Sequence, residues 1–191
     1  MLTDTDLFRR KFEQGLSYTD FVATGQAEGH HLQWQQRHEQ LALDAEQGKL
    51  LNGFARRMNV LCLSGSWCGD CALQGSAMAR VAEASDKIQL RFIPKADEHA
   101  DLIVPARIND GFRVPVSWFM AEDFAFISMF GDRTLSRYRS MARKALGSAA
   151  NVLAPPPADP VREVLAEVLA EFERVHLLLR ISGRLREKHG D

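Results

Sequence analysis

The stretch NVLCLSGSWCGDC, residues 59–71, joins an apolar run to a closely spaced pair of cysteines. Residues 59–65 have the length and the continuous apolar character of a strand buried on both faces of a sheet. From Cys71 to Ala84 the apolar residues follow a helical spacing. The sequence therefore predicts that Cys68 and Cys71 lie where a strand turns into a helix.

Two cysteines separated by two residues at a helix start have a particular chemistry. The unpaired N–H groups of the first helical turn point toward the first sulfur and stabilise a negative charge there. The pKa of Cys68 should therefore fall below the ~8.5 of a free thiol, toward about 7. Cys71 lies about one turn further on, close enough to form a small disulfide loop. We expect Cys68 to attack a disulfide as a thiolate, and Cys71 to resolve the resulting mixed disulfide.

The residues around the pair are candidates for substrate contact. Trp67 is interpreted as a partly exposed platform beside the sulfurs, the alternative being a core aromatic residue. Gly69 and Asp70 lie between the cysteines. Asp70 suits the solvated first turn of a helix, but its charge would oppose a neighbouring thiolate and make the couple more reducing.

The remaining pattern predicts an α/β fold with a mixed sheet. Residues 1–58 look helical, with a start signal at Ser17 and Asp20 and possible breaks at Gly48 and Gly53. The later segments are expected to be a strand at 88–94, a helical or irregular crossover at 97–109, an antiparallel hairpin of strands 116–120 and 124–130, a helix at 133–146, and a final helix from Pro160 to Leu185.

The predicted organisation has four parts. They are a helical N-terminal extension packed on the core (1–54), an α/β domain that contains the cysteine pair (55–146), a proline-rich linker (147–160) and a C-terminal helix (161–191). The last of these carries an amphipathic stripe of Val161, Val164, Leu165, Val168, Leu169 and Phe172.

Trp67-Cys68-Gly69-Asp70-Cys71 at a strand-to-helix junction resembles the active site of thioredoxins. Val114-Pro115, at the head of a later strand, resembles their cis-proline segment, which implies a cis bond lying against the cysteine pair and a backbone that binds extended substrates. More narrowly, the chain is similar to a bacterial thioredoxin-like subgroup with W-C-G-D-C and a helical N-terminal extension. Gly131-Asp132-Arg133 matches a Gly-x-Arg segment of that subgroup.

Two positions depart from the thioredoxin pattern. Thioredoxins carry proline at the position of Asp70, and a buried acid that moves protons for the resolving thiol at the position of Cys62. We interpret Cys62 as inert packing in a buried strand. The proton acceptor for Cys71 is then either Asp70 or water, which favours a slower or more specialised reductase.

The net charge and the N-terminal sequence limit which partners we expect. A formal net charge of −1 gives no electrostatic reason to expect nucleic acid or an anionic membrane. The start of the chain lacks the apolar run of a secretory signal, so the sequence reads as cytoplasmic. The expected partners are disulfide-containing proteins or small-thiol substrates in their disulfide form, together with an electron donor. No cofactor beyond a Cys68–Cys71 disulfide is expected, and the oligomeric state is open.

Three other functions compete with disulfide exchange. A zinc site needs four ligands, whereas Cys68 and Cys71 supply two and the adjacent His30 and His31 cannot readily bind one ion together. A non-catalytic module that binds extended polypeptides is the main alternative, favoured by the altered proton relay. Peroxidase activity is a weaker alternative, because the sequence shows no recognisable arginine and threonine arrangement of the kind that surrounds a peroxidatic cysteine.

Overall fold

A four-stranded mixed sheet forms the centre of the molecule. The computed structural model describes residues 4–147 and 154–191. The strand order is β2-β1-β3-β4, with β1 parallel to β2 and antiparallel to β3, and with β3 antiparallel to β4. The strands are β1 (Met58–Ser64), β2 (Ile88–Pro94), β3 (Val116–Ala121) and β4 (Phe126–Gly131). The predicted α/β class with a mixed sheet is confirmed.

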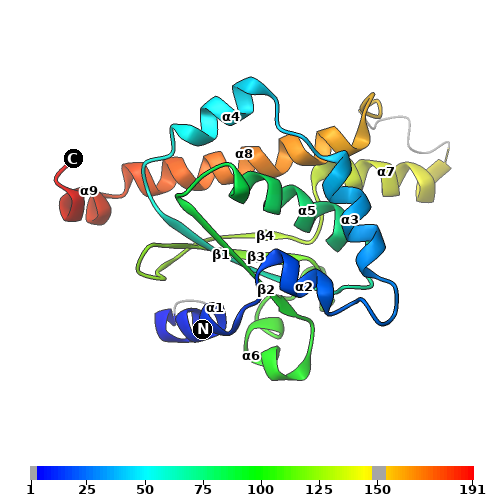
Figure 1. The fold of residues 1–191 in the computed structure, drawn as a ribbon, viewed down its shortest axis with the longest axis horizontal. Coiled ribbons are helices and arrows are strands. Elements are labelled where there is room, and N and C mark those ends of the chain that lie inside the picture. The colour runs from blue at the N-terminus through cyan, green and yellow to red at the C-terminus, as the bar shows by residue number, and fades with distance from the viewer. Residues whose placement is uncertain (1–3, 148–153) are drawn as a thin grey trace.

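Helices cover both faces of the sheet (Figure 1). Neighbouring residues of a strand point to opposite faces, and on β3 they identify the two layers. Phe119 packs edge-on against Phe172 of α8, whereas Trp118 faces Phe8 of α1. In Figure 1, α5 and α8 accordingly lie on one side of the sheet and α1 and α6 on the other. The helices after β1 are α5 (Gly69–Glu83), α6 (Ala100–Ile103), α7 (Leu135–Leu146), α8 (Pro160–Ile181) and α9 (Gly183–His189).

Before the sheet, the chain forms separate short helices and not one long helical segment. They are α1 (Thr5–Gln14), α2 (Tyr18–Ala23), α3 (His31–Gln40) and α4 (Ala45–Asn52). Ser17 caps α2 by accepting a hydrogen bond from the Asp20 N–H, as predicted. Gly53 follows the last residue of α4, whereas Gly48 lies inside that helix and does not break it.

An aromatic cluster attaches these helices to the sheet. Trp34 of α3 is completely buried, and Phe21 lies between it and Phe92 of β2, with both pairs of ring centroids 5.3 Å apart. Gly75 of α5 permits this approach, because a Cβ there would lie 2.6 Å from the Trp34 ring. The segment before β1 is therefore part of the same core as α5 and the sheet.

The hairpin of β3 and β4 begins its second strand later than predicted. Phe124 has a left-handed backbone, with φ of 68°. Few non-glycine residues adopt this conformation outside turns. The turn therefore extends past Asp123, and β4 begins at Phe126.

The C-terminal segment is two helices and not one. The predicted stripe is mostly buried in α8, which packs on α5 and β4. The expectation of a continuous helix to Leu185 is wrong, because the backbone is extended at Ser182, whose side chain caps α9 by accepting from the Leu185 N–H. Within the predicted linker, residues 148–153 lie outside the described residues, and 154–159 contain no regular secondary structure.

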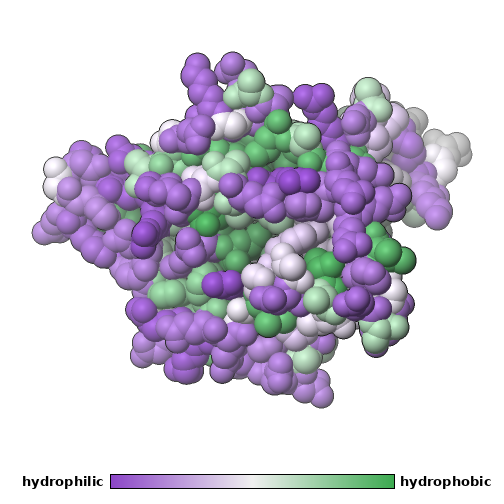
Figure 2. Space-filling model, in the orientation of Figure 1, coloured by the Kyte–Doolittle hydropathy of each residue, from purple (hydrophilic) through white to green (hydrophobic). Residues whose placement is uncertain are grey.

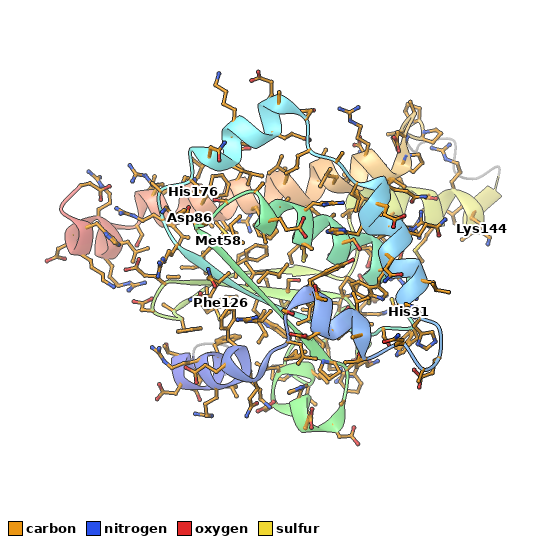
Figure 3. All side chains as sticks on the ribbon, in the orientation of Figure 1. His31, Met58, Asp86, Phe126, Lys144 and His176 are labelled. Carbon is orange, nitrogen blue, oxygen red and sulfur yellow. The ribbon has the colours of Figure 1, made fainter. Side chains whose placement is uncertain are left out.

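The end of α8 is anchored beside the entry to β1. His176, labelled in Figure 3, stacks on Phe54 at 4.2 Å between ring centroids and accepts a hydrogen bond from the Ala55 N–H. Burial lowers the pKa of His176, which favours the neutral ring that can accept this bond. The face drawn in Figure 2 has hydrophilic side chains around its rim and apolar ones toward its centre. None of the described helices has the length and apolar character needed to cross a lipid bilayer.

The packing of α8 on the sheet gives a stability prediction. Phe172→Ala should lower the free energy of unfolding by about 3–5 kcal/mol, because it leaves a cavity against Phe119. The matched control is Leu177→Ala on the same helix, where 52% of the side chain is exposed and the expected change is within about 0.5 kcal/mol. Urea unfolding measures both, and equal losses would contradict the assignment of Phe172 to the core.

Candidate active site

The cysteine pair lies at the point where β1 leads into α5. Cys68 is the N-cap residue of α5, and its Sγ accepts a hydrogen bond from the Cys71 N–H at 3.3 Å. Cys71 is in the first helical turn and completely buried, whereas Cys68 is partly exposed. Both are free thiols in the structure. The strand-to-helix junction predicted from the sequence is present, and it gives the two sulfurs different surroundings.

These surroundings separate the acidities of the two thiols. A hydrogen bond from the Cys71 thiol is the largest effect on Cys68 and lowers its pKa to about 7, against the opposing effects of partial burial and of Asp70. Burial raises the pKa of Cys71 far above that of a free thiol, and its hydrogen bond to Cys68 raises it further. Cys68 is therefore the thiol that ionises first near neutral pH.

Helix α3 holds the loop that precedes Cys68. The Ser66 carbonyl accepts hydrogen bonds from Gln33 Nε2 at 2.9 Å and from Trp34 Nε1 at 2.8 Å. Trp67 follows in the loop with 57% of its surface exposed, and its indole lies against Gly65. The predicted position of Trp67, partly exposed beside the cysteines, agrees with the structure.

Asp70 is not a solvated acid at a helix start. Its Oδ2 accepts a hydrogen bond from Arg133 Nε at 2.6 Å, and its Oδ1 accepts two from Arg137, with Nη2 at 2.6 Å. Only 14% of the Asp70 side chain is exposed. Burial by itself would raise the pKa of this carboxyl, but the hydrogen bonds from both arginines outweigh it and lower the pKa.

Arg133 also reaches a second buried acid. Its Nη1 donates to Asp132 Oδ2 at 2.5 Å, and the Tyr138 hydroxyl donates to the other oxygen of Asp132. The Asp132 side chain is completely buried. Asp70, Asp132, Arg133 and Arg137 thus form one network, which we call the Asp70 network. It joins the start of α5 to the start of α7.

Strand register places Pro115 at the end of the sheet where the cysteine pair lies. Val116 pairs with Leu63 on one side and with Gly131 on the other. Pro115 therefore lies at the end of the sheet where β1 leads into the cysteine loop. At this same end, β4 leads into the segment that contains Arg133. The Val114–Pro115 peptide bond is cis, as predicted, and the Gly131–Asp132 bond is also cis.

Cys62 is separate from this chemistry. It lies in the middle of β1 and is completely buried, and burial raises its pKa to about 12. This agrees with the interpretation of Cys62 as packing. Within residues 4–147 and 154–191, no three His, Cys, Asp or Glu side chains lie together as possible metal ligands.

Sequence reasoning missed the residues that support the pair from a distance. Gln33 and Trp34 contact the loop from α3, and Arg137 and Tyr138 contribute from α7. The only signal in the sequence was the match of Arg133 to the Gly-x-Arg segment. This match singled out the arginine but did not indicate that its side chain binds Asp70. Nothing in the local sequence relates the start of α7 to Asp70.

The different acidities predict an order of thiol reactivity. Iodoacetamide should modify Cys68 first, with a rate that rises with pH through about 7, because the thiolate is the reacting species. Cys71 and Cys62 should react later, because burial raises both of their pKa values. Time-resolved labelling with peptide mapping measures the order. Earlier labelling of Cys71 or Cys62 would contradict the described surroundings.

Comparisons with known proteins agree with this fold. A family model described as thioredoxin matches residues 15–144, which includes α2, α3 and α4 as well as the sheet. A protein of unknown function from Pseudomonas aeruginosa is similar in structure, with a TM-score of 0.61, 22% identity, and coverage of 86% of this chain and 95% of its own. An HIV epitope scaffold has a TM-score of 0.61 and 20% identity, covering 87% of this chain and 97% of its own.

No curated protein matches the sequence significantly. Because the two solved structures are only 22% and 20% identical to this chain, the similarity to them indicates a shared fold and nothing about function. The family model spans well over half of the chain, from the loop before α2 into the last turn of α7. With its mixed sheet and its cysteine pair at a strand-to-helix junction, the chain belongs to the thioredoxin family.

Proposed function

We propose that this protein is a thiol–disulfide oxidoreductase that cycles between a Cys68–Cys71 dithiol and the corresponding disulfide. The observation that carries the proposal is the hydrogen bond from the Cys71 N–H to Cys68 Sγ at the start of α5. It holds the sulfur of Cys68, the candidate nucleophile, against the backbone of the residue that carries the buried second thiol. The free N–H groups of a helix start stabilise the thiolate that the chemistry requires.

The exchange proceeds in two steps. Cys68 attacks as a thiolate one sulfur of a substrate disulfide, the substrate S–S bond breaks, and one substrate thiolate leaves. Cys71 then loses its proton and attacks Cys68 Sγ, which forms the Cys68–Cys71 disulfide and releases the second substrate thiolate. The substrate gains two electrons, and the protein loses them. An external thiol or dithiol reductant restores the protein.

The proton of Cys71 needs an acceptor that is not Asp70. The two arginines lower the pKa of the Asp70 carboxyl, which makes it a weak base near neutral pH. The thiolate released from the substrate in the first step is a stronger base, because free thiols have pKa values near ~8.5. We assign the proton to this departing thiolate or to water, and not to a residue of the protein.

The surroundings of the pair suggest how a disulfide-bearing chain would bind. Trp67 offers an exposed apolar surface beside Cys68, and Gly69 leaves the start of the helix open to approach. The backbone at Val114 and Pro115 would pair with an extended segment of substrate, as in strand addition. The proposed substrates are proteins or small molecules with an accessible disulfide, in a reducing cytoplasm with its own electron donor.

Reduction of insulin by dithiothreitol tests the activity directly. The purified protein should accelerate precipitation of the insulin B chain, and both Cys68→Ser and Cys71→Ser should abolish the acceleration, because turnover needs both thiols. Cys62→Ser is the matched control and should retain the activity, since Cys62 lies within the strand. Binding of unfolded chains without any acceleration would favour the alternative, a non-catalytic module for extended polypeptides.

A trapping experiment separates the roles of the two cysteines. Cys71→Ser should accumulate disulfide-linked partners on Cys68, because the resolving thiol is lost and the remaining Cys62 is buried in β1. Cys68→Ser should accumulate far fewer, because its two remaining thiols, Cys62 and Cys71, are both buried. Non-reducing electrophoresis after incubation with an oxidised test protein measures the adducts. Equal trapping by the two variants would contradict this division of roles.

A further inference from the structure

The Asp70 network places an ion cluster within the cysteine motif itself. Asp70 lies between Cys68 and Cys71, and its charge disfavours the Cys68 thiolate. An unpaired carboxylate at this position would therefore weaken the nucleophile. Both oxygens of Asp70 are instead engaged by guanidinium groups, through three hydrogen bonds of 2.6–2.8 Å.

The geometry of these bonds fixes the carboxylate as well as balancing its charge. Arg137 donates two hydrogen bonds to a single oxygen of Asp70, and Arg133 donates to the other. Arg133 is itself held by Asp132, which is completely buried. Charge-assisted bonds of this kind are short and directional. The Asp70 carboxylate therefore has little freedom to turn toward Cys68.

We propose that Arg133 and Arg137 are positioning residues for thiol exchange: by holding the Asp70 carboxylate between their guanidinium groups, they keep its charge from destabilising the Cys68 thiolate. This inference rests on the proposed function, and it extends the site to the start of α7. It also accounts for an acid at a position that would otherwise oppose the chemistry.

The network sets the direction in which the redox couple responds to substitution. A stabilised thiolate stabilises the reduced form and makes the couple more oxidising. Removing an arginine therefore destabilises the reduced form and makes the couple more reducing. Removing the charge of Asp70 has the opposite effect, because the remaining guanidinium groups then favour the thiolate.

Arg137→Gln is the sharpest test, since Arg137 is the more exposed of the two arginines, at 35% of its side chain. The rate of Cys68 alkylation by iodoacetamide is followed against pH in the reduced full-length protein. Near pH 7 the rate should fall about two- to fivefold, and its midpoint should move to higher pH. The alkylation rate of Arg137→Lys should lie between those of Arg137→Gln and the wild type. Lysine keeps the positive charge but cannot reproduce the paired hydrogen bonds of the guanidinium group.

Arg139→Gln is the matched control. It removes the same charge from the same helix, but Arg139 makes no described contact with Asp70. Its alkylation profile should stay within error of the wild type. Thermal unfolding of each variant shows whether the fold is retained, and equilibration with glutathione buffers gives the redox potential as a second reading. The potential of Arg137→Gln should become more reducing.

A double-mutant cycle decides whether Arg137 acts through Asp70. In an Asp70→Asn background, Arg137→Gln should slow alkylation less than it does in the wild type. An equal or larger effect in that background, or no effect in either, would overturn the proposal. Alkylation and glutathione equilibration need no protein substrate. A wild type that fails to reduce insulin yet shows this cycle would refute the proposed function alone.

Discussion

The hydrogen bond from the Cys71 N–H to Cys68 Sγ depends on how β1 turns into α5, and the chemistry of the site depends on that bond in turn. N-cap positions are usually filled by Ser, Thr, Asp or Asn, whose oxygens accept from the first helical turn. Here a sulfur takes that place. The helix start therefore gains most from its cap when the sulfur is negatively charged. Capping of the helix and the lowered pKa of Cys68 both arise at this cap position.

A difference in burial within one helical turn divides the two thiols. Cys68 retains contact with solvent, whereas Cys71 is enclosed between α5 and the sheet. A thiolate is costly to bury, so the second thiol stays protonated while the first ionises. This order suits a reaction in which the exposed sulfur must attack first and the enclosed one only after an adduct has formed.

The helices around the sheet support the cysteine loop as well as covering the core. Helix α3 fixes the Ser66 carbonyl with two side-chain donors, and Trp34 can do so only because Gly75 lets its ring approach α5. The two arginines that hold Asp70 flank the start of α7, with Arg133 just before the helix and Arg137 in its first turn. Helix α8 closes the opposite end of the core through Phe172 and His176. The site is thus held by segments that lie on both sides of it in the sequence.

The sequence by itself determined the strand-to-helix junction, the cysteine pair, the hairpin and the buried stripe of α8. Each is encoded by residues close together along the chain, through hydrophobic period, capping or turn chemistry. The break at Ser182 was also encoded locally, but the apolar pattern on both sides of it concealed the cap.

Only the tertiary structure decided the electrostatics of the site. Asp70 and Arg133 are 63 residues apart, and Ser66 and Trp34 are 32 apart, so neither pairing leaves a local pattern. A carboxylate in the first turn of a helix looks like a solvated acid whatever lies opposite it. Its partners depend on strand register and on how α7 leaves the sheet, which arise from packing between distant segments.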